Sequence, residues 1–292
     1  MKTVIITGAG AGIGRETAKL FAGKDHRVVV ADIDEVAAAG TVEQIKAAGG
    51  EAISYRLDVR GEREWEEFAR WVGTEFGSAD VLINNAGIMD LGGFVETTVA
   101  QWQRVVDIDL MSVIYGSRVF ARQMIDAGVR GHIVNISSGA AFMPSGLEPA
   151  YGVAKAAVLM ATQSLRVELR GHGIGVTAIC PGAIRTNLLA HGERNGLSEQ
   201  ERESWRAQID AVQSTFALAG PDKVARVIER SVRHNWAVVP VNPEAWFIYG
   251  LIRLSPTLAR VVPSVLSFER ADQLLAIGKP LLDRLSKGKV SA

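Results

Sequence analysis

The segment Thr7-Gly8-Ala9-Gly10-Ala11-Gly12-Ile13-Gly14 joins a short β-branched run, Val4 to Ile6, to a helix-like segment, Ile13 to Lys24. Glycines at these positions let the backbone turn sharply and approach a pyrophosphate at a helix N-terminus, where free N–H groups and the helix dipole attract anions. Glycines also mark ordinary turns, so the motif alone is weak evidence. Its place after a first strand and before a helix favours nucleotide binding.

The same alternation of apolar runs and helix-like segments continues along the chain. Further apolar runs lie at Val28 to Ala31, Ala52 to Tyr55, Val81 to Ile83, Ile133 to Ile136, Val176 to Ile179 and Val238 to Val239. Helices are expected at Val36 to Ala48, Glu62 to Phe76, Val99 to Ala127, Ala150 to Arg170 and Pro221 to His234. This pattern predicts an α/β fold, a Rossmann-like doubly wound parallel sheet of about seven strands with a C-terminal helical extension. We expect residues 1–242 to form a dinucleotide-binding catalytic domain, which residues 243–292 extend.

The composition excludes several classes of protein. Lys and Arg number 32 and Asp and Glu number 32, so the formal net charge is zero, whereas nucleic-acid binding needs a cationic surplus. The single cysteine cannot form an internal disulfide and the five histidines show no metal-ligand spacing, so we expect a reducing, cytoplasmic location and no metal. Glycine and threonine make residues 3–14 a poor core for a signal peptide. The longest uncharged stretch, residues 131–147, is broken by Asn, Ser, Gly and Pro and does not predict a membrane-spanning helix.

Asp32 ends the second apolar run, eighteen residues after Gly14. In a dinucleotide-binding fold an acidic group at this place accepts hydrogen bonds from the adenosine ribose and would repel a ribose 2′-phosphate. The neighbouring Ala11 and Ile33 are uncharged, so NAD is favoured over NADP, although Arg15 is a nearby cation. The alternative interpretation is that Asp32 caps the following helix.

Several more motifs follow in order along the chain. They are Asp58-Val59 after the third apolar run, Asn84-Asn85-Ala86-Gly87 after the fourth, Ser138 thirteen residues before Tyr151, the YxxxK segment Tyr151-Gly152-Val153-Ala154-Lys155, and Pro181 to Thr186 after the sixth. Their joint order and spacing resemble the short-chain dehydrogenase/reductase family in its single-domain form, over about residues 1–240. The resemblance implies that the cofactor is bound by Gly8, Ala11, Gly12, Ile13, Gly14, Asp32, Ile33, Asp58, Val59, Asn85, Ala86, Gly87, Tyr151, Lys155, Pro181, Gly182, Ile184 and Thr186.

Tyr151 and Lys155 are four residues apart in a helix-like segment, so their side chains share one face. A phenol has an ordinary pKa of about 10. An adjacent ammonium and an oxidised nicotinamide both favour the phenolate, which predicts Tyr151 as the general acid/base. Ser138 is expected to hydrogen-bond the same substrate oxygen, and the resemblance implies that Lys155 also binds the nicotinamide ribose. The alternative is an ordinary surface pair of Tyr and Lys, with Ser138 in a turn.

Asp109 departs from the family pattern. In Val106-Asp107-Ile108-Asp109-Leu110 it occupies the position at which the family has a catalytic Asn, which holds a water beside the lysine for a proton relay. A carboxylate could accept a hydrogen bond from the same water, but its charge would oppose phenolate formation. We expect Asp109 to be the fourth catalytic residue. The alternative is that it pairs with a nearby base or caps a bend.

The substrate pocket should lie beyond the carboxyl ends of the strands. The candidate lining residues are mainly apolar: Met89, Leu91, Phe94, Phe142, Met143, Leu188, Leu189 and Trp205. They predict a small hydrophobic alcohol or ketone, such as a cyclic or steroid-like one, rather than a polyol or sugar. Residues Asn187 to Gln208 mix charged and apolar side chains, which suits either a mobile lid or a plain surface helix.

The last fifty residues combine an apolar stripe with a basic end. The apolar residues are Trp246, Phe247, Tyr249, Leu251, Ile252, Leu254, Leu274, Leu275, Ile277, Leu281, Leu282 and Leu285, and the cations are Lys279, Arg284, Lys287 and Lys289. These helices could cover the substrate side or join a subunit interface. The other interpretation is weak peripheral membrane contact. The resemblance implies a homodimer or homotetramer through the helices near Val99 and Ala150.

Three classes of function remain. The motifs favour an NAD-dependent short-chain alcohol dehydrogenase or ketone reductase, which transfers a hydride between nicotinamide and a hydrophobic secondary alcohol or ketone. A non-catalytic NAD-binding regulator or scaffold with the same fold is the alternative, and the departure at Asp109 leaves room for it. Sugar-nucleotide epimerases and dehydratases usually show GxxGxxG, whereas this chain has GxxxGxG.

Overall fold

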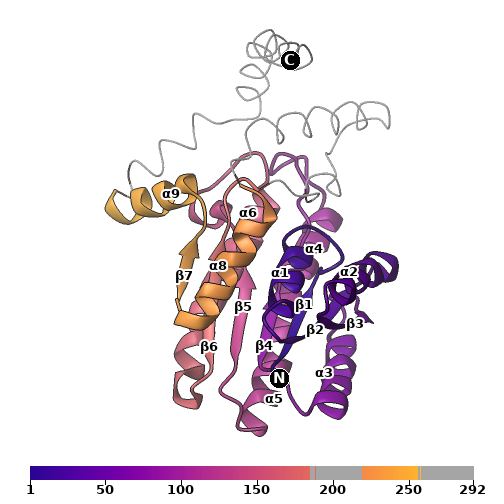
Figure 1. The fold of residues 1–292 in the computed structure, drawn as a ribbon. Helices are drawn as coiled ribbons and strands as arrows, with labels where there is room; N and C mark the ends of the chain where they lie inside the picture. The colour runs from indigo at the N-terminus through magenta and orange to yellow at the C-terminus, as the bar shows by residue number, and fades with distance from the viewer. Residues whose placement is uncertain (185–187, 189–218, 256, 258–292) are drawn as a thin grey trace, which may run out of the picture.

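The computed structural model describes residues 1–184, 188, 219–255 and 257. At its centre lies a parallel sheet of seven strands in the order β3-β2-β1-β4-β5-β6-β7 (Figure 1). The strands are β1 (Thr3–Thr7), β2 (Arg27–Asp32), β3 (Glu51–Arg56), β4 (Val81–Asn84), β5 (His132–Ile136), β6 (Gly175–Cys180) and β7 (Val238–Pro240). The strand order reverses between β1 and β4, so the doubly wound sheet predicted from the alternation is confirmed.

Helices cover both faces of the sheet (Figure 1). One face carries α1 (Gly12–Ala22), α2 (Glu35–Ala47) and α8 (Pro221–His234), and the other carries α3 (Glu62–Phe76), α4 (Val99–Val106), α5 (Ser112–Asp126) and α6 (Pro149–Leu169). Short 3-10 turns lie at Gly139–Phe142 and Arg170–His172, and α9 (Pro243–Leu254) follows β7. The crossovers between parallel strands place the helices against the sheet.

The core is divided between these two faces. Val4 and Ile6 of β1 pack against the layer of α1, α2 and α8, whereas Ile5 between them packs against α3 and α5. All three side chains are fully buried, because a central parallel strand has helices on both sides. Because all the strands pair in parallel, their carboxyl ends lie at the same edge of the sheet, where ligands of such folds bind.

One predicted helix is interrupted. The sequence predicts a continuous helix from Val99 to Ala127, but α4 and α5 are separated by a π-helical turn, Asp107–Met111. The wider π turn changes the angular position of its residues relative to the flanking α-helices. Asp109, in the middle of this turn, is fully buried. The helix predicted from Val99 to Ala127 is thus present, with a π-helical turn that the sequence pattern did not predict.

Some predictions lie outside the described residues. These are the roles of Thr186, Leu189 and Trp205, the lid or surface helix at residues 187–208 apart from Leu188, and the apolar and basic positions from Leu274 to Lys289. Within the described ranges, no helix has the length and apolar character needed to cross a bilayer. The same ranges contain no group of three or more His, Cys, Asp and Glu side chains arranged to hold a metal ion.

Candidate active site

The glycine turn between β1 and α1 is shaped by backbone constraints. Gly8 and Gly12 have φ values of 62° and 53°, which lie in the left-handed region that glycine adopts without strain. A Cβ on Gly14 would overlap the carbonyl oxygen of Gly8. The first turn of α1 contains no acidic residue, and Ala11 at its N-cap offers no side-chain hydrogen bond. The turn and the uncapped N–H groups of α1 therefore form a cradle that fits a pyrophosphate.

Thr7 and Asn85 brace this turn against the end of β4. The Thr7 hydroxyl accepts hydrogen bonds from the backbone N–H groups of Asn85 (3.0 Å) and Ala86 (3.1 Å). The Asn85 side-chain amide donates to the carbonyl oxygens of Thr7 (2.9 Å) and Gly8 (3.1 Å). Asn85 and Ala86 were predicted as cofactor contacts, and the structure shows how they also fix the turn. The sequence motif begins at Thr7, but it gave no sign that the Thr7 hydroxyl would hold the end of β4.

Asp32 lies directly beside the glycine turn. Its Oδ2 accepts a hydrogen bond from the Gly10 backbone N–H (2.8 Å), and its Oδ1 accepts one from the Asp34 N–H (3.0 Å). Helix α2 is capped by Asp34, whose carboxylate accepts from the Ala37 N–H (3.0 Å). The alternative that Asp32 caps this helix is therefore wrong, and its carboxylate is held beside the glycine turn. Its contact with the ribose remains a prediction.

Arg15 is tied to the same turn. Its Nε donates to the Gly10 carbonyl oxygen (3.0 Å) and to the Thr41 hydroxyl (3.3 Å). Thr41, which sequence reasoning missed, is fully buried and donates to the Ala9 carbonyl oxygen (3.0 Å). Arg15 thus supports the turn through hydrogen bonds to backbone and hydroxyl oxygens.

Asp58 and Val59 follow β3 at the same edge. The Asp58 carboxylate accepts hydrogen bonds from the Arg60 guanidinium (2.9 and 3.1 Å from Nε), and these bonds lower the pKa of Asp58 below its usual value. The Val59 carbonyl oxygen accepts from the Trp65 indole (2.9 Å). The contact of Asp58 and Val59 with the adenine remains a prediction. The Asp58 carboxylate is already paired with Arg60.

Ser138, Tyr151 and Lys155 meet at the carboxyl end of β5. Tyr151 and Lys155 lie one turn apart on α6 and are only 5% and 3% exposed, so the interpretation as a surface pair is wrong. The Lys155 Nζ lies 5.5 Å from the centre of the Tyr151 ring and donates to the Ile136 carbonyl oxygen (3.3 Å). The Ser138 hydroxyl accepts a hydrogen bond from the Ala140 N–H (3.1 Å), and Ser138 lowers the pKa of the Tyr151 phenol. That the three residues act on one substrate oxygen remains a prediction.

Asp109 joins this cluster from the π-helical turn. Its Oδ1 accepts a hydrogen bond from the Ile88 N–H (2.9 Å) and lies 3.6 Å from the Lys155 Nζ, whereas its Oδ2 is buried without a partner among the described residues. A Cβ on Gly87 would lie 2.7 Å from Asp109 Oδ1, so glycine at this position permits the close approach. Burial raises the pKa of Asp109 to about 6, and the charge of Lys155 acts in the opposite direction. Asp109 therefore pairs with a nearby base, Lys155, as the alternative interpretation predicted, and its catalytic role remains a prediction.

The pKa of Tyr151 is raised above its ordinary value. Burial is the main cause and the Asp109 carboxylate the second, while the hydrogen bond from Ser138 acts in the opposite direction. The sequence predicted that the Lys155 ammonium would favour the phenolate. Here the Asp109 carboxylate faces that ammonium, so the neutral phenol is favoured. Glu148, one turn before Tyr151 and missed by sequence reasoning, adds another negative charge.

Comparison with known proteins agrees with this geometry. A family model of short chain dehydrogenases matches residues 2–195. The chain belongs to the short-chain dehydrogenase family. It is 42% identical over 261 residues to a probable oxidoreductase, EphD, of Mycobacterium tuberculosis, covering 88% of this chain but 44% of EphD. The chain thus spans less than half the length of that relative.

Two further matches cover most of both chains. One is the 2,5-dichloro-2,5-cyclohexadiene-1,4-diol dehydrogenase LinX of Sphingobium indicum, which is 33% identical over 242 residues, 81% of this chain and 96% of LinX. The other is the crystal structure of a short-chain dehydrogenase/reductase from Burkholderia phymatum in complex with NAD, with a TM-score of 0.80 and 29% identity over 89% of this chain and 95% of that one. The family predicted from the motifs is confirmed.

The loop that the family resemblance predicts to face the nicotinamide follows β6. Pro181, Gly182 and Ile184 lie at the carboxyl edge as predicted, and the Pro181 carbonyl oxygen accepts a hydrogen bond from the Gly139 N–H (2.7 Å). This bond joins the loop to the segment that begins with Ser138. The backbone of the loop is therefore tied to the backbone next to Ser138, the predicted catalytic serine.

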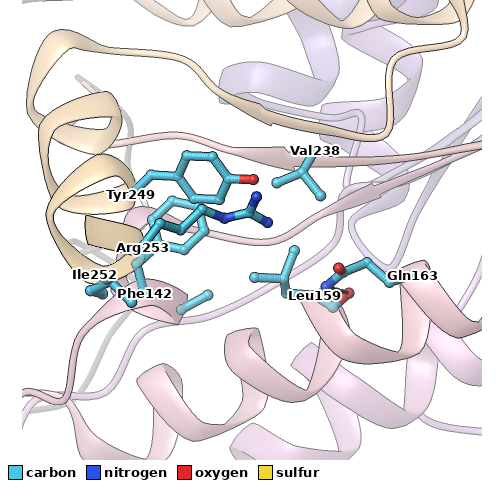
Figure 2. A pocket seen from close by; sticks show the side chains of 8 residues that line it. Phe142, Leu159, Gln163, Val238, Tyr249, Ile252 and Arg253 are labelled. Atoms are coloured by element: carbon cyan, nitrogen blue, oxygen red, sulfur yellow. Dashed lines mark hydrogen bonds between the residues drawn. The ribbon is translucent and has the colours of Figure 1, made fainter. Parts of the chain in front are cut away.

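A cavity of about 220 Å³ lies between the Gly139–Phe142 turn, α6, β7 and α9 (Figure 2). It is lined by Ala141, Phe142, Leu159, Gln163, Val238, Tyr249, Ile252 and Arg253. Phe142, predicted to line the substrate pocket, packs here against Tyr249 of α9 with ring centres 4.9 Å apart. Phe94, another predicted lining residue, is 67% exposed and packs edge-on to Trp102. These two aromatic side chains thus contact α9 and α4.

Proposed function

We propose that the chain is an NAD-dependent alcohol dehydrogenase or ketone reductase, which transfers a hydride between nicotinamide and a hydrophobic secondary alcohol or ketone. The observation that supports this most directly is the buried cluster of Ser138, Tyr151 and Lys155 beside a glycine cradle. The names of EphD and LinX and the NAD complex of the Burkholderia protein support the same class of reaction.

The residues present fit a dinucleotide. The uncapped N–H groups at the start of α1 would hold the pyrophosphate, Asp32 the adenosine ribose, and Lys155 the nicotinamide ribose. The segments Asn85 to Gly87 and Pro181 to Thr186 would contact the nicotinamide end. When bound, the cofactor supplies the hydride donor or acceptor. The cradle fits because side chains on its glycines would fill the space beside the turn.

Proton transfer in this proposal depends on the phenol of Tyr151. In the reduction direction the neutral phenol donates its proton to the oxygen of the nascent alkoxide, and in oxidation the phenolate accepts the alcohol proton. Ser138 holds the same oxygen by a hydrogen bond. Because the pKa of Tyr151 is raised, the chain is suited to donate this proton near neutral pH, and oxidation should accelerate at alkaline pH.

Asp109→Asn should shift the rising limb of the pH–kcat profile for oxidation to lower pH by about one unit, because removing the carboxylate charge lowers the pKa of Tyr151. The wild-type carboxyl itself becomes neutral below its pKa of about 6, so the two profiles should converge there. If Asp109 also keeps the relay role, Asp109→Ala should lower kcat by about 10-fold or more. Steady-state kinetics across the pH range would measure both effects.

Asp107→Asn is the matched control for Asp109. Asp107 lies in the same π-helical turn but accepts a hydrogen bond from the exposed Gln103 side chain (2.7 Å). Its replacement should leave the pH profile unchanged. An Asp109→Ala variant with full turnover would overturn the relay role, and an unmoved Asp109→Asn profile would overturn the electrostatic one.

Exchange of Asp32 should change the cofactor preference. The double variant Asp32→Asn with Ile33→Arg should lower the ratio of kcat/KM for NAD to that for NADP by about 100-fold, because it replaces repulsion of a 2′-phosphate with attraction. Ile33 is 52% exposed, so an arginine fits there without repacking. Asp34→Asn, which changes only the cap of α2, is the control. A ratio that stays at the wild-type value would refute the assignment of Asp32.

A stripe on α6 supports the proposal of a homodimer or homotetramer. Val153, Met160 and Val167 recur every seven residues on one helix face and are 53%, 65% and 78% exposed in the single chain. We infer that this face packs against its copy around a two-fold axis. Met160→Lys should convert the oligomer to a monomer in light scattering coupled to size-exclusion chromatography. A wild type that is already monomeric at micromolar concentration would contradict this inference.

A substrate panel tests the function as a whole. Reduced-nicotinamide absorbance would be followed with NAD and NADP over hydrophobic secondary alcohols, cyclic alcohols and polyols. We expect faster turnover of the hydrophobic alcohols. Faster turnover of the polyols would refute the substrate class, and NAD binding without turnover of any substrate would favour the scaffold.

A further inference from the structure

The start of α9 contacts the nicotinamide-side loop, although the two are far apart in the sequence. The Ala183 N–H donates a hydrogen bond to Glu244 Oε1 (3.2 Å). The Asn242 side-chain amide donates to the Ala183 carbonyl oxygen (3.2 Å) and to the same Glu244 Oε1 (2.9 Å). Both backbone polar groups of Ala183 are thus held by the side chains of Asn242, at the N-cap of α9, and Glu244, in its first turn.

The side chain of Asn242 bonds to the loop and not to the backbone of its own helix. Asparagine is a favoured N-cap residue, and Asn242 stands at the N-cap of α9, yet its side chain makes no capping hydrogen bond. The side chain is fully buried and faces Ala183 and Glu244. Pro243 at the first helical position has no N–H to satisfy, which lowers the need for a cap. The local sequence therefore leaves Asn242 free to hold the loop.

The junction is closely packed on both sides. A Cβ on Gly182 would overlap the Glu244 carboxylate, so the approach of Glu244 requires glycine there. Gly139, next to Ser138, donates its N–H to Pro181 and lies against Ala245, the residue after Glu244. Ala245 is only 1% exposed. The Ser138 segment, the loop and α9 therefore meet at one buried point.

Two acceptors at this junction have no partner. Asn242 Oδ1 and Glu244 Oε2 are buried and lack a hydrogen bond within the described part of the chain. Buried acceptors without donors destabilise a fold, so their presence needs a reason beyond local stability. These two oxygens could accept a hydrogen bond from a donor group of a bound molecule.

We propose that Glu244 and Asn242 are positioning residues for the cofactor, and that they hold Pro181 to Ile184 in the conformation that receives its nicotinamide end. The start of the C-terminal extension is then a part of the cofactor site. A loop that is already ordered before binding loses less conformational entropy when the cofactor binds. The inference rests on the proposed function, because it assumes that NAD is the ligand of this loop.

The test compares Glu244→Ala with the conservative Glu244→Gln. The alanine variant should raise the Kd for NAD about 10-fold in calorimetry, because the loop must be ordered on binding. It should lower kcat/KM for NAD at least as much. The glutamine variant retains an oxygen that accepts from Ala183 and should stay within about 3-fold of wild type. Phe247→Ala, on the same helix with a side chain 69% exposed, is the matched control and should leave the Kd unchanged.

The outcomes separate this inference from the proposed function. Glu244→Ala with wild-type affinity for NAD would overturn the positioning role, as would equal losses in Glu244→Ala, Glu244→Gln and Phe247→Ala. If Glu244→Ala does not fold, Asn242→Ala decides, because it removes the amide that donates to the Ala183 carbonyl oxygen and should raise the Kd similarly. A folded wild type that binds no NAD would instead refute the proposed function.

Discussion

Tyr151→Phe should lower kcat by about 10³-fold while leaving the Kd for NAD within about 3-fold of wild type. The change removes only the hydroxyl, which is the group proposed to exchange a proton with the substrate oxygen. The buried ring remains in place on α6, so the neighbouring Lys155 keeps its contact with Ile136 and Asp109. Stopped-flow or steady-state absorbance with a substrate found in the panel would measure the loss.

Tyr249→Phe is the matched control for this loss. Tyr249 packs against Phe142 through its ring, and the variant keeps that ring while removing a hydroxyl outside the catalytic cluster. It should retain turnover close to wild type. A Tyr151→Phe variant with more than about one tenth of wild-type turnover would mean that another group transfers the proton.

Gly14→Ala should abolish measurable NAD binding, which corresponds to a loss of at least about 100-fold in affinity, and should lower the free energy of unfolding by about 1–3 kcal/mol. The added Cβ would overlap the Gly8 carbonyl oxygen and lie 2.8 Å from the Ala9 Cα. Both are backbone atoms of the cradle, so relief requires the turn itself to open. Calorimetry with NAD and urea unfolding would measure the two effects.

Gly40→Ala makes the same chemical change as Gly14→Ala, but we expect it to stabilise the fold and to leave NAD binding unchanged. Gly40 lies within α2, and a Cβ there would have no neighbour within 4 Å. The substitution should raise the free energy of unfolding by about 0.5–1 kcal/mol, because alanine loses less backbone entropy in a helix. NAD affinity should be unchanged. Wild-type NAD affinity in Gly14→Ala would show that the glycine turn is not the cofactor cradle.

The fold was predictable because its signals are local. The β-branched runs, the glycine turn and the helical spacing between them appear within short windows, and they predicted the strands and most of the helices. The pairing of Tyr151 with Lys155 is local too, since four residues on a helix share one face. Ser138 could be placed beside them from the motif order of the family.

The electrostatics of the site could not be predicted because they depend on distant residues. The interruption of the helix at Asp107 to Met111 places Asp109 beside Lys155, and a regular helical pattern gives no sign of it. The direction of the Tyr151 pKa then depends on burial and on that carboxylate together. The hydrogen bonds of Thr7 to β4 and of Glu244 to Ala183 likewise join segments that lie far apart in the sequence.

Transfer of deuterium from labelled reduced nicotinamide to a hydrophobic ketone tests the proposed chemistry most directly. The alcohol product would be examined by mass spectrometry, with NAD binding confirmed by calorimetry for each protein. We predict that the wild type places deuterium on the carbinol carbon and that Tyr151→Phe, which binds NAD equally well, forms almost no labelled product. A wild type that binds NAD but leaves every ketone in the panel unlabelled would contradict a role in hydride transfer and would make the chain a nucleotide-binding scaffold.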